Sequence, residues 1–488
     1  MMSRVYLRAD GSAAIGYGHV HRLLSLAQML RKDFECTFVS HETPEFLIQE
    51  LKKLSIPLIK TNSIAYKFPD EKNPGEEIVF DMDAILGRND IVVLDGYWFG
   101  KKYQREIKKK GCTLVYVDDL AEEGAVADCI INHSLGVSCS DYKNIAPATC
   151  IYLGAPYSLI NIPEKFRRLH VDKNIVGHVL MAMGGADPLN FTCKILDEHK
   201  SFIQQFEKVV VLVGNGYQYW KQLEETVSVF YSVEIIKNVS KEEVFGLMQT
   251  CSFAILSAST MAMEYAHIGG GLAVIQTAAN QHFLYKGLIE NEIALSVENM
   301  AVANKDQIDN IQFNQREIFD GHSPDRFVKL FKNLQTHASL SLIDAGKEHV
   351  GITYQWASDP GIRAYSFFRR QISFEEHNKW YGSKVEHSGC VYLLGLLENN
   401  IVGSIRFDIT GSIALISYLV APQFQGKGLG GILLAKGLEY LAENKTIVTR
   451  ADGYVMPENI ASVKVFERLG FVAEIQTDRI LFTKNIYM

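Results

Sequence analysis

The sequence has no excess of basic residues, few prolines, no paired cysteines and no long apolar run. Its 49 Lys and Arg stand against 56 Asp and Glu, a formal net charge of −7, and only 12 of its 488 residues are proline. A protein that binds the phosphate backbone of a nucleic acid needs clustered positive charge, so we expect no nucleic-acid partner. With 47% apolar residues, the composition excludes a disordered chain and indicates a globular protein of about three domains.

The eight cysteines lie singly along the chain, without a C-x-x-C pair or a dense framework. Such spacing is typical of reduced thiols rather than of a disulfide scaffold. The first ten residues already carry Arg4, Arg8 and Asp10, so we expect no signal peptide, and no later apolar run has the length of a membrane span. We therefore predict a cytoplasmic protein that does not insert into a membrane.

Short β-branched runs alternate with helical patterns through the first two thirds of the chain, starting at Val5–Leu7 and restarting at His178–Met183. This alternation is typical of parallel sheets flanked by helices. We predict an α/β protein with two Rossmann-like domains, residues 1–155 and 156–335, joined by a crossing segment at 153–168 that glycine and prolines interrupt. After a polar connector at 335–339 the pattern becomes α+β, which predicts a third domain over residues 340–488.

The first candidate site is a glycine turn that follows the first strand. Gly16 and Gly18 precede a run of apolar residues at helical spacing, so His19 lies in the first helical turn, and Arg22 closes the motif. The amides of a helix start favour an anion such as a phosphorylated substrate, and they disfavour imidazolium. A neutral His19 could accept a proton from water as a general base. The alternative is a histidine that only packs or caps the helix.

Acidic residues at two more strand ends point to the same cleft. Asp95 and Tyr97 follow the apolar run at 91–94, and Asp118 and Asp119 follow the run at 114–117. Ligands of open parallel sheets bind beyond the carboxyl ends of the strands. We predict that Asp95 orients His19 or the turn and that Tyr97 holds the water or a sugar hydroxyl. The carboxylates could instead cap the segments that follow them.

Polar turns after three strands of the second domain predict a nucleotide site. A glycine turn could hold a diphosphate, hydroxyls could bind phosphate, and the amides after the next strand could bind the remaining phosphate or sugar. Glu264, one turn into its helix, could take both ribose hydroxyls, although a carboxylate near a helix start is also favourable by itself. The candidate residues are Gly185, Asp187, Ser259, Thr260, Glu264, Asn280 and Gln281.

Residues 1–335 carry, in this order, the motifs R-A-D-G-S-A-A-I-G-Y-G-H-V-H-R, D-G-Y, V-D-D, G-G-A-D-P-x-N-x-T, S-A-S-T-M-A-M-E and A-N-Q. In this the chain resembles the UDP-sugar hydrolases of pseudaminic acid biosynthesis, which have the GT-B fold of two Rossmann-like domains. The resemblance implies hydrolysis of UDP-2,4-diacetamido-2,4,6-trideoxy-β-L-altrose without a metal, by water attacking the anomeric carbon. It further implies that His19 activates this water, that Tyr97 belongs to the site, and that Glu264, Asn280 and Gln281 contact the uridine diphosphate.

The third domain contains a strand, a glycine-rich loop and a helix start at 416–431. The spacing Gln425-x-x-Gly428-x-Gly430 turns successive amides inward, where they can bind a pyrophosphate. A second helical motif runs from Asn459 to a stop at Gly470. With both motifs the chain resembles the GNAT superfamily of N-acetyltransferases, which implies acetyl-CoA as co-substrate and direct acetyl transfer to an amine. The resemblance assigns to the coenzyme Leu419, Val420, Gln425, Gly426, Lys427, Gly428, Leu429, Gly430, Asn459, Ser462 and Phe466.

The chain departs from these families at a few positions. Residues 258–261 stand where the hydrolases commonly have a glycine, and His21 follows the G-H-V of the first motif. Phe466 stands where many acetyltransferases carry a tyrosine that protonates the leaving thiolate, and no acidic residue precedes Ile416 where a base often lies. Water, Tyr418 or Asp408 could serve instead.

Residues 372–381 and 403–408 resemble the acetyltransferase branch that acts on amino sugar nucleotides. We therefore expect a bifunctional enzyme whose substrates are UDP-linked amino sugars, with other enzymes of the nonulosonic acid pathway as possible partners. The third domain would acetylate the 4-amino group, and the first two would then release UDP. The alternatives are a GT-B glycosyltransferase fused to an amino-sugar acetyltransferase and a sugar-nucleotide-binding module without catalysis. A GNAT domain that binds acetyl-CoA without turnover is a further alternative for residues 340–488.

Overall fold

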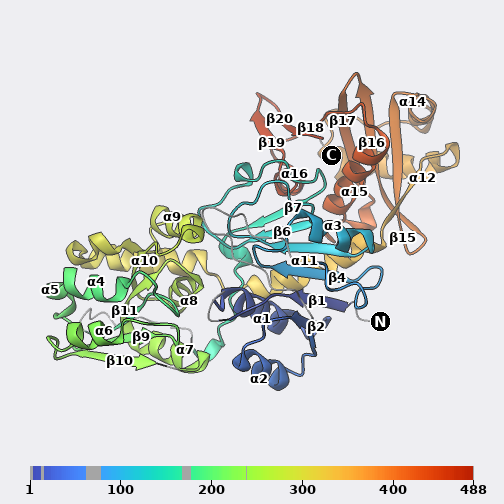
Figure 1. Ribbon diagram of the computed structural model, residues 1–488. Coiled ribbons are helices and arrows are strands. Elements are labelled where there is room, and N and C mark those ends of the chain that lie inside the picture. Colours follow the sequence, from blue (N-terminus) through green and yellow to red (C-terminus); the bar gives the residue numbers. More distant parts are fainter. Residues whose placement is uncertain (1–3, 13–15, 62–78, 167–176, 238, 487–488) are drawn as a thin grey trace.

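Three β-sheets follow one another along the chain, as Figure 1 shows. The computed structural model describes residues 4–12, 16–61, 79–166, 177–237 and 239–486. Residues 13–15 of the first glycine motif and 167–168 of the crossing segment lie outside them. The first two sheets are wholly parallel and the third is mixed. The predicted mixed α/β class with parallel sheets is thereby confirmed.

The first sheet has seven strands in the described part of the chain, in the order β3-β2-β1-β4-β5-β6-β7. Every residue of β4 and β5 is buried, as expected for central strands of a parallel sheet that helices cover on both faces. The strands are β1 (Arg4–Arg8), β2 (Glu35–Ser40), β3 (Leu58–Lys60), β4 (Ile91–Asp95), β5 (Thr113–Val117), β6 (Cys129–Asn132) and β7 (Cys150–Leu153). Its helices are α1 (Gly18–Leu30), α2 (Glu45–Leu54) and α3 (Lys101–Lys109).

The second sheet repeats this design with the strand order β10-β9-β8-β11-β12-β13. The strands are β8 (His178–Ala182), β9 (Lys208–Val213), β10 (Val233–Lys237), β11 (Cys251–Ser257), β12 (Gly271–Ile275) and β13 (Leu295–Ser296). The helices are α4 (Phe191–Glu198), α5 (Lys200–Ile203), α6 (Trp220–Val227), α7 (Lys241–Thr250), α8 (Thr260–Ile268), α9 (His282–Glu290) and α10 (Lys305–Ile318).

The long helix α11 (Ser323–Ser339) follows the second sheet in sequence but packs on the first domain. Its apolar residues Phe327, Leu330, Phe331 and Leu334 recur at helical spacing and belong to the core cluster around α1. The chain therefore crosses back after α10. Most of α11 lies within the range predicted as the second domain, although its apolar face belongs to the first.

The third sheet has the order β14-β15-β16-β17-β18-β20-β19 and is antiparallel except for the pair β17 and β18. That pair is in register only from Ile413–Arg450 to Ile416–Gly453, so the rest of β17 has no partner in β18. The strands are β14 (Ser341–Asp344), β15 (Cys390–Leu397), β16 (Asn400–Thr410), β17 (Ile413–Val420), β18 (Arg450–Val455), β19 (Val472–Ile475) and β20 (Ile480–Asn485). The helices are α12 (Val350–Ser358), α13 (Pro360–Ala364), α14 (Phe374–Val385), α15 (Leu429–Asn444) and α16 (Ile460–Arg468).

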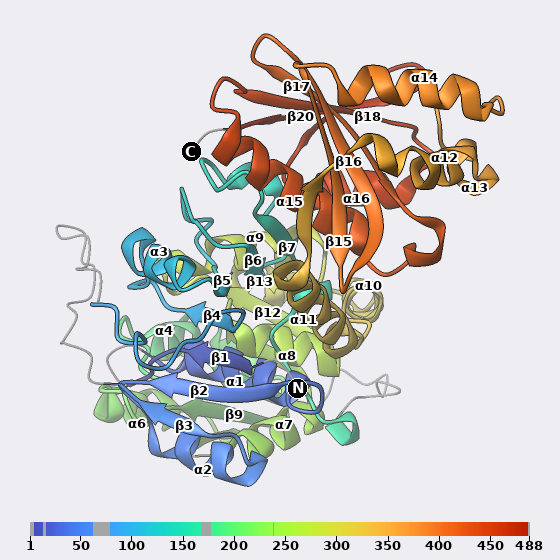
Figure 2. The same ribbon diagram turned by 90° about the vertical axis from the view of Figure 1, so that its right-hand side faces the viewer.

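The third domain stands on the first, with α11 between them (Figure 2). Helix α15 packs on α11, and α16 packs on the edge strand β7, where the Arg468 guanidinium lies 5.7 Å from the ring centre of Tyr152. The second domain lies on the other side of the first, as Figure 1 shows. The eight cysteines are free, as predicted. No helix in the described part of the chain is long and apolar enough to cross a membrane.

Candidate active sites

A buried charge network surrounds His19 at the carboxyl ends of β4 and β5. His19 Nδ1 lies 2.6 Å from Asp95 Oδ1, and Arg22 Nε donates to Asp95 Oδ2 at 2.9 Å. Arg22 also donates to Asp119 Oδ2 at 2.8 Å. All four side chains are buried. The start of α1 and two strand ends thus bring together His19 and Arg22 of the first motif with Asp95 and Asp119 of two later motifs.

The charge of Asp95 indicates which ring nitrogen of His19 carries the hydrogen. Burial alone would raise the pKa of Asp95, but the Arg22 guanidinium and His19 outweigh it and hold that pKa below its ordinary value. A charged Asp95 can only accept, so we place the ring hydrogen on Nδ1, although Arg22 also lies 2.8 Å from that nitrogen. The lone pair is then on Nε2. This is the tautomer that a general base needs.

Tyr97 joins this network to the second domain. Its hydroxyl donates to Asp119 Oδ2 at 3.1 Å, and Asn280 Nδ2 donates to the Tyr97 oxygen at 2.8 Å. Burial and the nearby Asp119 raise the pKa of Tyr97, so the phenol stays protonated at neutral pH. The Tyr97 ring packs edge-on against His19 at 4.9 Å. His19 therefore lies where the first and second domains meet.

The adjacent carboxylates Asp118 and Asp119 have different roles. Asp118 accepts from the backbone N–H groups of Leu120 and Glu122 at 2.8 and 2.9 Å, which is a local capping role. Asp119 instead bonds Arg22 and Tyr97 inside the network. The two interpretations of this pair, cap or site, thus apply to one residue each.

Three predicted UDP contacts occupy polar positions at the carboxyl edge of the second sheet. Glu264 is 3% exposed, and its Oε2 accepts from Lys241 Nζ at 2.6 Å. Ser259 is the N-terminal cap residue of α8, and Thr260 is the first residue of that helix. A carboxylate, a lysine and two hydroxyls therefore gather around the start of α8.

Two other predicted UDP contacts, Asp187 and Gln281, form hydrogen bonds with residues close to them in sequence. Asp187 accepts from the backbone N–H groups of Phe191 and Thr192 at 2.8 Å each, so it caps α4. Gln281 Oε1 accepts from the Thr277 N–H at 2.7 Å. Gly185 has open space where a side chain would stand. The structure thus brings Asn280 to the His19 network. The side chains of Asp187 and Gln281 instead accept hydrogen bonds from backbone N–H groups nearby in the sequence.

Three side chains near the network were missed in the sequence. Trp98 packs edge-on against His19 at 5.3 Å. His133 is 3% exposed, and burial together with Arg22 lowers its pKa to about 4. His133 follows β6 directly, so its place at a strand end was a usable signal. Nothing in the sequence pairs Lys241 with Glu264, because only the fold brings α7 to α8.

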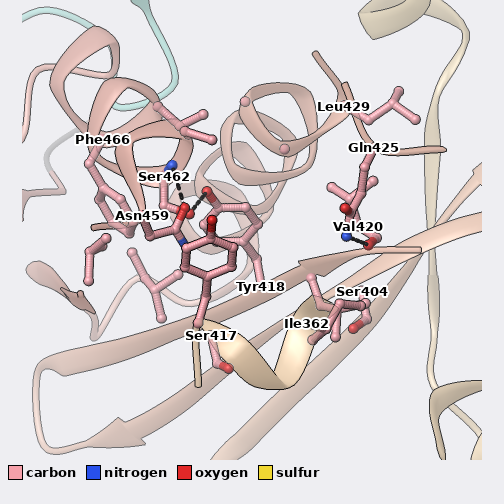
Figure 3. A pocket seen from close by; sticks show the side chains of 18 of the residues that line it. Ile362, Ser404, Ser417, Tyr418, Val420, Gln425, Leu429, Asn459, Ser462 and Phe466 are labelled. Carbon is pink, nitrogen blue, oxygen red and sulfur yellow. Dashed lines mark hydrogen bonds between the residues drawn. The ribbon is translucent and has the colours of Figure 1, made fainter. Parts of the chain in front are cut away.

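A cavity of about 1340 Å³ is lined mainly by the third domain, beside the end of β17 that has no partner in β18 (Figure 3). Figure 3 shows the Tyr418 hydroxyl bonded to Ser462 Oγ, at 2.9 Å, and Asn459 Oδ1 accepting from the Ser462 N–H, at 3.2 Å. On the other side Gln425 donates to the Val420 carbonyl at 3.3 Å. All the predicted coenzyme residues line this cavity except Lys427. The Lys427 ammonium lies over the Phe424 ring, 5.3 Å from its centre.

The structure distinguishes between the acid and base candidates of this domain. Phe466 is buried, and its ring stacks on that of Phe482 with the ring centres 4.9 Å apart, so it packs in the hydrophobic core. Burial raises the pKa of Tyr418 despite its bond to Ser462, which keeps a phenol O–H in the cavity. Asp408 bonds Lys384 at 2.7 Å and Arg406 at 3.0 Å, and these cations, against the effect of burial, hold its pKa low. Tyr418 is thus the better placed proton donor.

Residues 352–471 match the family model "Acetyltransferase (GNAT) family". The third domain is a GNAT acetyltransferase domain, attached to two parallel-sheet domains. A protein of Rickettsia conorii is 32% identical over 111 residues, 22% of this chain and 100% of that protein, so the chain belongs to one family with it.

Two further relatives match longer parts of the chain. An uncharacterized protein of Methanocaldococcus jannaschii is 23% identical over 493 residues, 96% of each chain. The UDP-2,4-diacetamido-2,4,6-trideoxy-β-L-altropyranose hydrolase of Campylobacter jejuni is 21% identical over 282 residues, 57% of this chain and 93% of that one. The chain is thus similar to a sugar-nucleotide enzyme in addition to its GNAT domain.

Solved structures with a matching part include a spermidine N-acetyltransferase of Vibrio cholerae in complex with CoA and spermine. It is 20% identical, with a TM-score of 0.29 over 30% of this chain and 96% of that one. The ribosomal L7/L12 alpha-N-protein acetyltransferase in complex with coenzyme A is also 20% identical, with a TM-score of 0.28 over 30% of this chain and 94% of that one.

Among the described residues no group of three or more His, Cys, Asp or Glu side chains is arranged to hold a metal ion. A reaction without a metal remains a prediction.

Proposed function

We propose that the protein is a bifunctional nucleotide-sugar enzyme. Its GNAT domain acetylates the 4-amino group of a UDP-linked 2-acetamido-dideoxy sugar, using acetyl-CoA. Its first two domains, paired as in the GT-B fold, then hydrolyse UDP from UDP-2,4-diacetamido-2,4,6-trideoxy-β-L-altrose. The observation that carries the hydrolase half is the buried contact of His19 with Asp95 at 2.6 Å, beside a hydrogen bond between the two domains.

In the hydrolytic step His19 acts as the general base. Its Nε2 takes a proton from water while the water oxygen attacks the anomeric carbon. The bond from that carbon to the phosphate oxygen breaks, and its electron pair leaves with UDP. Asp95 holds the ring through Nδ1 and stabilises the imidazolium that forms, and Arg22 keeps Asp95 ionised so that it does not take the proton itself.

The two sheet edges offer places for the leaving group. A side chain at Gly16, Gly18 or Gly185 would meet nothing within 4 Å, so the backbone of these turns is open to a ligand. We assign the ribose hydroxyls to Glu264, and the diphosphate to the start of α8 with Ser259 and Thr260. Lys241, 2.6 Å from Glu264, adds a positive charge near the phosphates. Asn280 contacts Tyr97 and would lie next to the sugar.

In the acetyl transfer the amine nitrogen attacks the thioester carbon, the nitrogen loses a proton to water, and the CoA thiolate leaves. The Tyr418 O–H projects into the cavity and can return a proton to that thiolate. The acceptor end of the cavity is lined by His377, Trp380, Tyr392 and Arg406, and the Arg406 guanidinium lies 4.9 Å from the centre of the Trp380 ring. Aromatic and cationic side chains together suit a substrate that carries a sugar and phosphates.

Product analysis tests both halves. The full chain is incubated with the UDP-linked 4-amino sugar, with and without acetyl-CoA. With acetyl-CoA we expect free diacetamido sugar, UDP and CoA, and with chemically acetylated UDP-sugar we expect UDP release without any acetyl-CoA. Absence of UDP in both would contradict the hydrolase half, and absence of CoA would contradict the acetyltransferase half. UDP release that requires an added sugar acceptor would instead assign a glycosyltransferase.

A further inference from the structure

The cavity of the GNAT domain extends beyond that domain. Part of its wall comes from helix α11, which packs on the first domain, and part from the edge of the first sheet around β7. These wall residues are Asp128, Ala148, Cys150, Tyr152, Lys329, Leu330, Asn333, Leu334 and His337. A GNAT domain by itself would leave this side of the cavity open to solvent.

The contact between α11 and the glycine loop is close. A Cβ on Gly428 would lie 2.7 Å from Asn333 Oδ1 and 2.8 Å from its Nδ2, and Gly428 has a φ of +80°. Gly428 directly precedes the first residue of α15. In the described part of the chain no hydrogen bond holds the Asn333 carboxamide, so it stands beside the amides of the loop with its N–H groups available to an anion.

Positive side chains line the same end of the cavity. Lys329 lies one helical turn before Asn333 and on the same face of α11. Within the described ranges no carboxylate pairs with Lys329, whereas its neighbour Lys332 pairs with Asp33 at 2.6 Å. Lys464 and Arg468 of α16 line the cavity as well, and the Arg468 guanidinium lies 5.7 Å from the ring centre of Tyr152 in the wall around β7.

The cavity is lined by two acidic residues, Asp128 and Glu376, and each is already in an ion pair, with Lys108 and with Arg370. In the described lining of the cavity no free carboxylate therefore meets the positive side chains of Lys329, Lys464 and Arg468. Coenzyme A has a diphosphate and a further phosphate on its ribose, so its nucleotide end matches this charge.

We propose that α11 completes the acetyl-CoA site of the GNAT domain. Asn333 donates to the diphosphate that the loop at Gly428 holds, and Lys329 pairs with a phosphate of the nucleotide end. The coenzyme then lies between the first and third domains, with its thioester toward Tyr418 and its nucleotide against α11. This inference rests on the proposed use of acetyl-CoA, and it adds a part of the site that lies outside the GNAT domain.

The test is calorimetric titration of the full chain with CoA and with 3′-dephospho-CoA, which needs no sugar substrate. We expect Lys329→Ala to weaken CoA binding about five- to tenfold, and Asn333→Asp to weaken it tenfold or more because a carboxylate would face the diphosphate. Lys332→Ala is the matched control on the same helix, and its binding constant should stay within twofold of the parent's. If Lys329 contacts the ribose phosphate, Lys329→Ala has its effect on CoA alone; if it contacts the diphosphate, both ligands weaken.

Thermal unfolding curves that match the parent's show that the variants fold. Binding within twofold of the parent for either Lys329→Ala or Asn333→Asp would overturn the proposal, and so would an equal loss in Lys332→Ala. A parent chain that binds no CoA at all would contradict the acetyltransferase function as well, so the two failures are distinguishable.

Discussion

In the proposed hydrolysis, the charges around Asp95 are what allow His19 to act as a base. A buried carboxylate without a partner would become protonated and would no longer orient an imidazole. Arg22 prevents this with two bonds to Asp95 and a third to Asp119. In the proposed reaction the imidazolium would therefore meet a fixed negative charge, because the single guanidinium of Arg22 stands against the two carboxylates of Asp95 and Asp119.

The substitution Asp95→Asn tests this charge. The amide oxygen of the new side chain would still accept from the ring N–H but could not stabilise the imidazolium, so we expect kcat for UDP release to fall by about 10²- to 10⁴-fold with a smaller change in KM. Asp118→Asn is the control, because Asp118 caps a local turn and should change kcat less than about threefold. Acetyl transfer by the same preparation shows that the chain is folded. A kcat above a tenth of the parent's in Asp95→Asn would contradict the mechanism.

His133 gives the fold a sensitivity to acid. Burial and Arg22 lower its pKa from 6.5 to about 4, so between these pH values the unfolded chain binds the proton and the native chain does not. Stability from this residue is therefore complete above about pH 6.5 and is lost as the pH falls toward 4. Between pH 6.5 and pH 4 we expect His133→Asn to lose about 1 to 3 kcal/mol less stability than the parent, so its Tm should fall less steeply.

The measurement is thermal unfolding at half-unit steps of pH, with His387→Asn as the control because His387 is exposed. Parallel curves for the parent and His133→Asn would show that the His133 pKa is not lowered in the native chain.

Helix α9 sets the contact between the first and second domains. A Cβ on Gly287 would lie 2.2 Å from the backbone N of Gly136, and the N–H of Gly136 donates to the Phe283 carbonyl of α9 at 3.1 Å. Backbone of one domain thus rests directly on backbone of the other. Asn280, which reaches Tyr97, lies just before this helix.

Gly287→Ala should therefore destabilise the protein and separate the two halves of the proposed hydrolase site. We expect the free energy of unfolding to fall by about 1 to 3 kcal/mol and kcat/KM for UDP release to fall at least tenfold. Gly246→Ala, also inside a helix but with open space around it, should instead stabilise by about 0.5 to 1 kcal/mol. Denaturant titration measures the change in the free energy of unfolding of each variant. Changes of the same sign in the two variants would contradict this account.

The three domains place the two candidate sites on different sides of the first domain. The His19 network lies toward the second domain, and the GNAT cavity lies toward the third. Side chains at such separated sites contribute independently unless the domains are coupled.

Separate inactivation of the sites checks this arrangement. His19→Gln should stop UDP release, so that the acetylated UDP-sugar accumulates while CoA is still formed at the parent's rate. Tyr418→Phe should slow CoA release at least tenfold and leave UDP release from the acetylated substrate within twofold. Chromatography of the nucleotide products follows both reactions. Loss of acetyl transfer in His19→Gln would show instead that the two sites depend on each other.

Much of the fold follows from the sequence, because strand and helix periods are local properties. The alternation of apolar runs predicted two parallel sheets and a third α+β domain, and the structure has them. The glycine loop and the helix after Asn459, read through their resemblance to the GNAT superfamily, predicted coenzyme residues that line one cavity in the structure, except Lys427. Strand ends likewise predicted that Asp95 and His19 would lie close together.

What the sequence could not determine are contacts between segments that only packing brings together. The place of α11 on the first domain, the pair of Lys241 with Glu264, and the division of roles between Asp118 and Asp119 all depend on how the elements pack. A local pattern shows which face of a helix is apolar, but not which sheet will cover it. The sequence by itself therefore determined the elements and the chemical groups, and the tertiary structure decided which groups meet, because burial and charge pairing act between parts of the chain that are far apart in sequence.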